Sequence, residues 1–191
     1  MPGSIKSSVI PITKLTLVIG GARSGKSRLA ERLATRTDRP RRYIATAEAH
    51  DAEMALRIAR HRADRGEGWT TAEAPHTLEG ALGAARADEV VLVDCATLWL
   101  TNRLLAGDDL DAASGALLAA LEACPAPVIV VSNEVGWSIV PDNALARRFS
   151  DAQGRLNQRL AAQAGLVIAV IAGLPMVLKG AMPGLSPDPE D

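Results

Sequence analysis

The stretch LTLVIGGARSGKS, residues 15–27, decides the fold class of this chain. Its first five residues form an apolar run of the length of a buried strand, and Gly20–Ser27 matches the pattern G-x-x-x-x-G-K-[ST]. A helix over Lys26–Thr37 is expected next. Glycines let backbone N–H groups approach phosphate oxygens, the helix N-terminus adds partial positive charge, and the lysine spans the outer phosphates. The stretch therefore predicts a strand, a phosphate-binding loop (P-loop) and a helix. The predicted nucleotide contacts are Gly20, Gly21, Ala22, Arg23, Ser24, Gly25, Lys26 and Ser27, with Ser27 also a Mg²⁺ ligand.

Apolar runs and helical stripes alternate along the rest of the chain. Strands are expected over Arg42–Ala45, Val90–Val93, Val128–Ser132 and Val167–Ile171. Helices are expected over Asp51–Asp64, Leu78–Arg86, Leu110–Ala123 and Asp142–Ala164, the last with an apolar stripe of Leu145, Phe149, Ala152, Leu156 and Leu160. This alternation predicts an α/β, three-layer P-loop NTPase-like fold, with a mainly parallel sheet and helices on both faces.

The chain divides into one domain and two short ends. Residues 1–14 are expected to be an N-terminal extension, residues 15–179 a single P-loop nucleotide-binding catalytic domain, and the proline-rich residues 180–191 a disordered tail. The apolar stretch Ala164–Leu178 is too short and too interrupted to span a membrane, and is interpreted as a strand and a loop. Without a secretory signal in the sequence, a cytoplasmic location is expected.

Charge excludes one class of partner and favours another. Of the 191 residues, 48% are hydrophobic and the formal net charge is -1, so the chain as a whole has no polycationic field for nucleic acid. Residues 1–70, however, hold 14 basic and 7 acidic residues, a net +7, which favours a small anionic ligand in that half. Cys95 and Cys124 have neither disulfide-framework nor zinc-site spacing.

Further candidate site residues follow the ends of the expected strands, the edge at which ligands bind in open α/β sheets. They are Thr46, Asp94, Asn133, Glu134 and Gly173. Asp94 ends a run of four aliphatic residues and is a candidate Mg²⁺ ligand; the alternative is a cap of the helix that begins near Thr97. One crevice shared with the P-loop is expected.

The three histidines differ in what their positions favour. His50 and His76 stand at helix starts and are interpreted as surface residues. His61 lies seven residues after Met54 and three after Ile58, on the body-facing side of its helix, among arginines suited to a polyphosphate. From spacing alone it is either a partly buried structural histidine or a ligand-facing one. The exposed arginines of the long helix, Arg148, Arg155 and Arg159, are either a solvated face, a subunit contact or a substrate clamp, and the tryptophans Trp69, Trp99 and Trp137 are assigned by default to core or interface.

Taken together, the motifs resemble a specific family over about Leu15 to Lys179, the bifunctional adenosylcobinamide kinase/adenosylcobinamide-phosphate guanylyltransferases of cobalamin biosynthesis. The residues that carry the resemblance are the P-loop, Tyr43–Ala47, Asp51–Met54, Arg57–Ile58, His61–Arg62, Trp69, Glu73, Asp94–Cys95, Trp99–Asn102, Ser132–Gly136, Val140–Pro141, Arg147, Phe149, Asp151, Gly154, Arg155 and Asn157–Gln158. The resemblance implies a kinase that uses ATP or GTP on adenosylcobinamide, followed by transfer of GMP from GTP through a covalent GMP-histidine to adenosylcobinamide phosphate. It also implies a homo-oligomer, such as a trimer.

The resemblance further implies roles for single residues. The guanylylated histidine falls on His61, which with Lys26 is a catalytic residue. Further nucleotide contacts are Ala45, Thr46, Ala47, Arg62, Ala63, Asp64, Arg65, Glu73 and Asp94; Mg²⁺ is the cofactor, held by Ser27 and Asp94. Glu73 is a candidate reader of guanine N1–H and N2–H, the alternative being a surface glutamate. Arg65-Gly66 departs from the Arg-Pro pair usual in the family. The alternative functions are a simple P-loop small-molecule kinase without a covalent GMP intermediate, or a non-catalytic GTP-dependent regulatory module.

Overall fold

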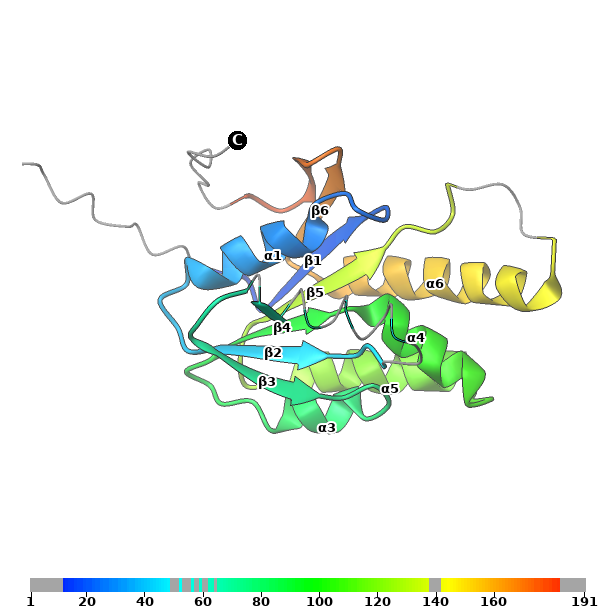
Figure 1. Ribbon diagram of the computed structural model, residues 1–191, viewed down its shortest axis with the longest axis horizontal. Coiled ribbons are helices and arrows are strands. Elements are labelled where there is room, and N and C mark those ends of the chain that lie inside the picture. The colour runs from blue at the N-terminus through cyan, green and yellow to red at the C-terminus, as the bar shows by residue number, and fades with distance from the viewer. Residues whose placement is uncertain are drawn as a thin grey trace, which may run out of the picture.

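The structure, a computed structural model, describes residues 12–48, 52, 56, 59, 62–63, 65–137 and 142–182 (Figure 1). Its strands are β1 (Leu15–Gly20), β2 (Arg41–Ala45), β3 (Trp69–Glu73), β4 (Val90–Asp94), β5 (Val128–Asn133), β6 (Leu166–Ile171) and β7 (Leu174–Lys179). Its helices are α1 (Lys26–Thr35), α3 (Leu78–Gly83), α4 (Ala96–Leu105), α5 (Leu110–Ala123) and α6 (Ala144–Gln163). Within the helix expected over Asp51–Asp64, the described residues 52, 56, 59, 62 and 63 are all helical.

The strands form one sheet in the order β3-β2-β4-β5-β1-β6-β7. Every neighbouring pair is parallel except β6 and β7, which are antiparallel. The carboxyl ends of the six neighbouring strands from β3 to β6 therefore meet at one edge. The register pairs Gly20 with Asn133 across β1 and β5, and Ala45 with both Asp94 and Glu73 across β2, β4 and β3. This places the residues that follow the strands side by side, as the sequence predicts.

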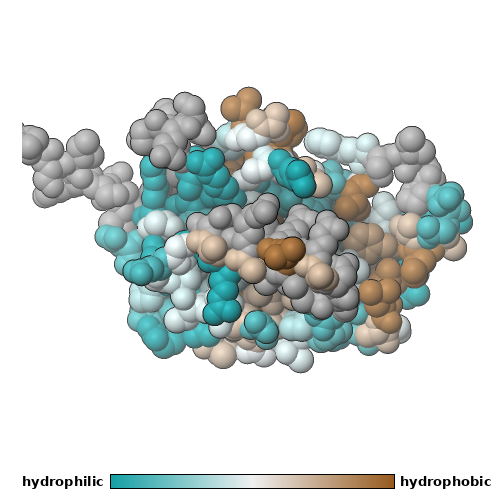
Figure 2. Space-filling view, viewed as in Figure 1, coloured by the Kyte–Doolittle hydropathy of each residue, from teal (hydrophilic) through white to brown (hydrophobic). Residues whose placement is uncertain are grey.

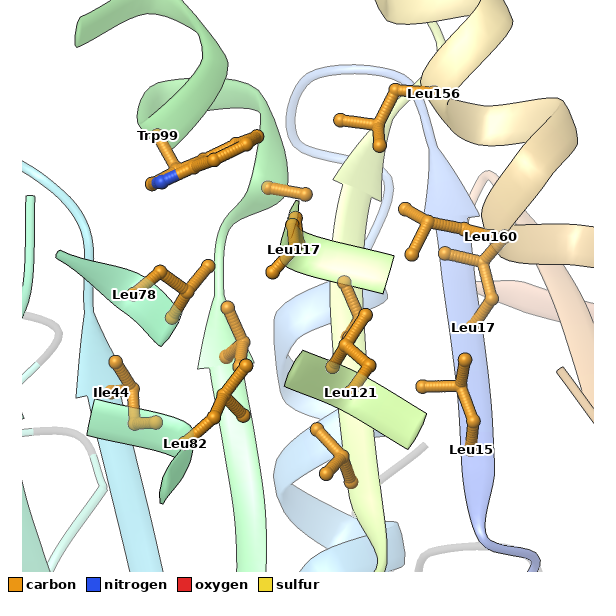
Figure 3. Close-up of a cluster of buried hydrophobic side chains, with 14 of the residues drawn as sticks. Leu15, Leu17, Ile44, Leu78, Leu82, Trp99, Leu117, Leu121, Leu156 and Leu160 are labelled. Carbon is orange, nitrogen blue, oxygen red and sulfur yellow. The ribbon is translucent and has the colours of Figure 1, made fainter. Parts of the chain in front are cut away.

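Apolar side chains bury both faces of the sheet, so the three-layer α/β class is confirmed. On one face α3, α4, α5 and α6 pack on the sheet around Trp99, Leu117 and Leu156, which are at most 1% exposed (Figure 3). On the other face α1 packs through Leu29, Ala30 and Leu33 against the opposite side of the sheet. Strands covered on both sides explain the uninterrupted aliphatic runs of β4 and β5.

Two strands were not expected from the sequence. The interpretation of Ala164–Leu178 as a strand and a loop is wrong, because residues 174–179 return as β7 through a turn at Ala172 and Gly173, whose φ angles are 51° and 82°. The edge strand β3 has the sequence WTTAE, without the apolar run that marks a buried strand. Both strands lie at the ends of the sheet, where burial on two faces is not required.

Some local expectations are also corrected. Leu145 belongs to the predicted apolar stripe but is 53% exposed, because it lies in the first turn of α6, beyond the core that begins at Ala152. Of the tryptophans assigned to core or interface, Trp99 is fully buried in the core, whereas Trp137 is 76% exposed, which excludes the core and leaves the interface as its prediction. Of the described residues, no helix is long and apolar enough to cross a membrane. Residues 1–11 and 183–191, most of the expected N-terminal extension and tail, lie outside the described ranges, so these boundaries stay predictions.

The outer strand β7 carries an exposed apolar surface. All six of its residues are exposed, with Leu174 at 72%, Met176 at 50% and Leu178 at 57%. Figure 2 shows hydrophobic side chains gathered at the top of the molecule, where the β6–β7 hairpin lies in Figure 1. Exposed apolar side chains in a contiguous group are typical of a contact surface.

Candidate active site

A cavity of about 280 Å³ opens at the carboxyl edge of the sheet. Its lining comes from the ends of five neighbouring strands and from the segment that precedes β3. The lining residues are Ala22, Lys26, Ser27, Tyr43, Ala45, Ala47, Arg62, Arg65, Thr71, Glu73, Asp94, Cys95, Leu98 and Asn133. Lysine and arginine side chains thus share one cavity with two carboxylates, an arrangement suited to a phosphorylated ligand that also carries hydrogen-bond donors.

The P-loop is shaped by glycines and by its neighbours in the sheet. Gly25, just before α1, has a φ of 92°, and a Cβ on Gly20 would lie 2.5 Å from the Val170 carbonyl oxygen. The Ser24 carbonyl accepts a 3.0 Å hydrogen bond from the N–H of Gly173 in the β6–β7 turn, so the turn braces the loop from outside. Lys26 Nζ donates to the Gly21 carbonyl at 3.1 Å and lines the cavity.

Asp94 lies at the end of β4, on the cavity side of the sheet. The alternative role as a helix cap is wrong, because the N-cap of α4 is Cys95 and no side chain caps that helix. The Tyr43 hydroxyl lies near the Asp94 carboxylate, and burial together with the charge of Asp94 raises the pKa of Tyr43 well above its ordinary value. Tyr43 therefore remains a neutral donor at physiological pH.

Stacked side chains connect the cavity with the edge of the sheet. The guanidinium carbon of Arg65 lies 3.3 Å from the centroid of the Tyr43 ring. The Tyr43 ring meets the Trp69 ring edge-on, with centroids 6.1 Å apart and planes at 85°. Arg41 in turn lies 5.5 Å from the Trp69 centroid. The contact with Tyr43 places Arg65 at the cavity wall.

Thr46 is placed differently from its neighbours. It is fully buried, and its hydroxyl donates to the Cys95 carbonyl at 2.7 Å and accepts from the Cys95 N–H at 2.8 Å. Asn102 Nδ2 donates to the Thr46 carbonyl at 2.9 Å. The Thr46 side chain thus ties β2 to the turn after β4, while Ala45 and Ala47 on either side of it line the cavity. Desolvation, followed by the charge of Asp94, raises the pKa of Cys95 to about 11, so this thiol stays protonated at neutral pH.

Asn133 completes the floor of the cavity between the P-loop and Asp94. Its backbone N–H donates to Thr97 Oγ1 at 2.8 Å, and its carbonyl accepts from Asn157 Nδ2 at 3.1 Å. Asn157 belongs to a buried network in which its Oδ1 accepts from Ser132 Oγ and from Gln153 Nε2. The end of β5 is therefore fixed from α4 and from α6 at once.

The cavity gathers nine of the predicted nucleotide contacts. They are Ala22, Lys26, Ser27, Ala45, Ala47, Arg62, Arg65, Glu73 and Asp94. Gly20, Gly21, Arg23, Ser24, Gly25, Thr46 and Ala63 are described but do not form part of its lining. His61 and Asp64, like His50, lie outside the described residues, so the roles assigned to them stay predictions.

Other expected residues lie elsewhere, and some lining residues were missed. His76 pairs with Glu48 at 3.2 Å outside the cavity lining, and Arg155 pairs with Asp111 of α5 at 3.4 Å. Tyr43, Thr71 and Leu98 were not assigned to the site from the sequence. Tyr43 belongs to the quoted family motif, a signal that could have found it, whereas Thr71 lies on the unexpected strand β3.

The donor set agrees with a metal ion that is held together with phosphate. Among the described residues no three or more His, Cys, Asp and Glu side chains gather into a cluster that could hold a metal by themselves. Ser27 and Asp94 nevertheless line the same cavity as Lys26. A hydroxyl and a carboxylate are the oxygen ligands with which P-loop proteins hold a phosphate-bound Mg²⁺.

Comparison with known proteins identifies the family. The sequence model of the family described as cobinamide kinase / cobinamide phosphate guanyltransferase matches residues 16–178. The chain belongs to this family. It is thus an enzyme of adenosylcobalamin biosynthesis, with kinase and guanylyltransferase activity. The resemblance on which the sequence interpretation rested is confirmed.

Relatives agree with the assignment along nearly their whole length. The chain is 51% identical over 167 residues to the bifunctional adenosylcobalamin biosynthesis protein CobP of Pseudomonas aeruginosa, covering 86% of this chain and 96% of that protein. It is 43% identical over 182 residues to the bifunctional adenosylcobalamin biosynthesis protein CobU of Salmonella typhimurium, covering 86% and 99%.

Solved structures at low identity show the fold alone. The flagellar accessory protein FlaH of Methanocaldococcus jannaschii matches with a TM-score of 0.51 at 14% identity, covering 90% of this chain and 80% of that one. An ATPase of a type III secretion system of pathogenic bacteria matches with a TM-score of 0.53 at 11% identity, covering 85% and 53%. The P-loop NTPase-like architecture expected from the sequence is confirmed.

Proposed function

We propose that this enzyme carries out both reactions in the cavity at the sheet edge, and that guanylyl transfer passes through GMP bound covalently to His61. One observation carries the proposal. The cavity joins the P-loop lysine, Asp94 and Glu73 to Arg62 and Arg65, and Arg62 directly follows His61 in the sequence. A triphosphate group and a nucleophile from that segment can therefore meet in one place.

The layout of the cavity suggests how GTP lies in it. The P-loop follows β1, and Glu73 ends β3, four strands away in the sheet order. At about 4.8 Å between strands this is about 19 Å, a span of the order of an extended nucleoside triphosphate. The phosphates then lie at the P-loop, and guanine lies at Glu73, whose carboxylate accepts from N1–H and N2–H. Selectivity for GTP follows, since adenine offers no such pair of donors.

The transferase steps balance as two displacements at the α-phosphorus. A neutral imidazole nitrogen of His61 attacks, a P–N bond forms, and the P–O bond to pyrophosphate breaks with its electron pair leaving on pyrophosphate. The proton on the other ring nitrogen is released to solvent. The ring of the GMP-histidine takes up a proton from solvent, a phosphate oxygen of adenosylcobinamide phosphate attacks the same phosphorus, and the P–N bond breaks with its electron pair returning to the neutral imidazole. Adenosylcobinamide-GDP then leaves. Lys26 and the two arginines stabilise the charge that develops on the departing pyrophosphate.

The kinase step uses the same P-loop contacts but takes place at the γ-phosphorus. The aminopropanol hydroxyl of adenosylcobinamide attacks the γ-phosphorus of ATP or GTP and its proton is released to solvent. The bond from the γ-phosphorus to the β-phosphate oxygen breaks, and the nucleoside diphosphate leaves with the electron pair. Lys26 and the loop N–H groups hold the transferred phosphoryl group. Ser27 and Asp94 would hold Mg²⁺, which supplies charge neutralisation between the phosphates when bound.

The decisive experiment traps the intermediate. Incubation with α-labelled GTP and Mg²⁺, followed by denaturation, should leave acid-labile, alkali-stable label on the protein, with release of pyrophosphate. His61→Ala should abolish the label, whereas the matched control His76→Ala should keep it, because His76 is paired with Glu48 outside the cavity lining. Label that persists in His61→Ala would remove His61 from the mechanism. Phosphorylation of cobinamide without any adduct would favour the simple kinase.

Two further parts of the proposal concern the oligomeric state and the cellular location of the enzyme. The exposed apolar side chains of β7 support a homo-oligomer, such as a trimer, in which this surface is covered by a second copy. Because ATP and GTP are cytoplasmic metabolites, the cytoplasm is the proposed place of reaction.

A further inference from the structure

Tyr43 is the buried aromatic residue of the cavity wall, and its three contacts differ in kind. The residue is 6% exposed. Its ring face carries the guanidinium of Arg65, with Cζ 3.3 Å from the centroid. Its ring meets Trp69 edge-on, and its hydroxyl lies near the Asp94 carboxylate. A phenylalanine would give the same ring contacts but would remove the hydroxyl beside the carboxylate.

The position of Tyr43 in the sheet indicates which part of GTP lies near its contacts. β2 lies between β4, which ends at Asp94, and β3, which ends at Glu73. If the triphosphate extends from the P-loop and guanine reaches Glu73, the part of GTP over β4 and β2 is the α-phosphate and ribose. This step rests on the proposed function. Arg65, stacked on Tyr43 of β2, then lies beside this part of GTP.

We propose that Tyr43 is a positioning residue for guanylyl transfer, whose ring holds the Arg65 guanidinium and whose hydroxyl orients the Asp94 carboxylate at the α-phosphate of GTP. An arginine side chain has many rotamers, and holding it in one before the reaction lowers the cost of reaching the transition state. A stacked guanidinium also keeps its N–H groups available to an anion that lies in the guanidinium plane, because the stacking uses only its face.

Substitutions separate the two contacts. Tyr43→Phe keeps the ring and removes the hydroxyl, so we expect adduct formation within about threefold of wild type at saturating Mg²⁺, with a higher Mg²⁺ concentration needed for half the maximal rate. Tyr43→Met removes the ring, and Arg65→Lys removes the planar cation. Each should slow adduct formation about 2- to 30-fold in single-turnover experiments with labelled GTP, the range that corresponds to a cation–π contact. The rate at saturating GTP should fall by more than the GTP dissociation constant rises.

A double-mutant cycle tests whether the two residues act together. The variant Tyr43→Met/Arg65→Lys should be no more than about twofold slower than the slower single variant, since either change removes the same arrangement. Arg41→Lys is the matched control. It alters the other arginine of the stack, 5.5 Å from Trp69, which is not part of the cavity lining, and should leave the adduct rate unchanged.

The outcomes are distinct. Multiplicative losses in the double variant, or a loss in Arg41→Lys as large as in Arg65→Lys, overturn the role of Tyr43 while leaving the covalent mechanism intact. If Tyr43→Met does not fold, Arg65→Lys and Tyr43→Phe decide, because neither substitution removes core volume. A wild-type rate of adduct formation in Arg65→Lys overturns the proposal. So does a rate in Tyr43→Phe at saturating Mg²⁺ that is lower than the rate in Arg65→Lys. Absence of the GMP adduct in the wild-type protein overturns the proposed function and, with it, this one.

Discussion

The ion pair between Arg42 and Glu89, at the edge of the sheet opposite the cavity, should contribute to stability without affecting catalysis. Glu89 precedes β4, at the end of the strand opposite Asp94. Its side chain is 3% exposed and accepts from Arg42 Nε at 3.0 Å, from Arg42 Nη2 at 3.2 Å and from the Arg86 backbone N–H at 2.8 Å. Glu89→Gln keeps the shape but removes the charge that these donors face.

The magnitude follows from burial. Breaking a fully buried pair costs about 3–5 kcal/mol, and a hydrogen bond to a charged group is worth about 1.5–3 kcal/mol. Arg42 is 20% exposed and regains some water, so we expect the free energy of unfolding of Glu89→Gln to fall by about 2–3 kcal/mol. For a chain of this size the melting temperature should drop by about 4–12 °C. Denaturant unfolding at pH 7 measures the change.

The pH dependence gives the sharper test. Burial opposes the charge of Glu89, but the bonds from Arg42 and Arg86 outweigh it, so the pKa of the folded carboxyl lies below its ordinary value. A lowered pKa contributes stability that is present above the unfolded value of about 4.3 and is lost as the pH falls through the folded value. The advantage of wild type over Glu89→Gln should be constant from pH 5 to 8 and shrink below about pH 4. Asp88→Asn, beside it but 62% exposed, should change little. A constant difference at low pH, or a loss of kinase rate in Glu89→Gln at 25 °C, would refute this reasoning.

Three further predictions concern the core, the loop and the outer strand. Leu117→Ala, at a position 1% exposed, should lower the free energy of unfolding by about 2–5 kcal/mol in denaturant titrations. Gly20→Ala should weaken GTP binding in equilibrium titrations and destabilise the fold by about 1–3 kcal/mol, because the new Cβ meets the Val170 backbone oxygen, which cannot move aside; unchanged GTP affinity would contradict it. Replacing Leu174 and Met176 together by lysine should shift sedimentation toward the monomer, and an unchanged distribution would show that β7 is not the contact between copies.

The sequence predicts the parts of the fold in which burial and periodicity act together. β1, β4 and β5 have aliphatic runs because helices cover both of their faces, and α5 has the bounds that its stripe predicts, Leu110–Ala123. β3 escapes prediction because Thr70 and Thr71 are exposed on an edge strand, so no apolar run is selected there. β7 escapes because its turn needs a positive φ at Ala172, a residue type that gives no such signal.

The candidate site also has parts that the sequence predicts and parts that it does not. The P-loop and Asp94 are local patterns that follow strands, so their place at the sheet edge could be predicted. The stacking of Arg65 on Tyr43 joins residues 22 positions apart in the sequence and depends on the order of the strands, which no local pattern specifies. Thr46 shows the reverse case, where a residue in a predicted contact segment turns its side chain into the interior to bond Cys95.

Distribution of the cavity over the ends of five strands has a consequence for how the enzyme acquires its ligand. No single βα unit contains the P-loop, Asp94 and Glu73 together. A partly folded chain therefore presents only part of the nucleotide-binding surface. Ligand affinity then belongs to the completed sheet alone, and GTP at about 100 times its dissociation constant would add about 2.7 kcal/mol to the stability of the entire domain rather than of one loop. Cellular nucleotide thereby stabilises only those molecules in which the whole sheet has formed.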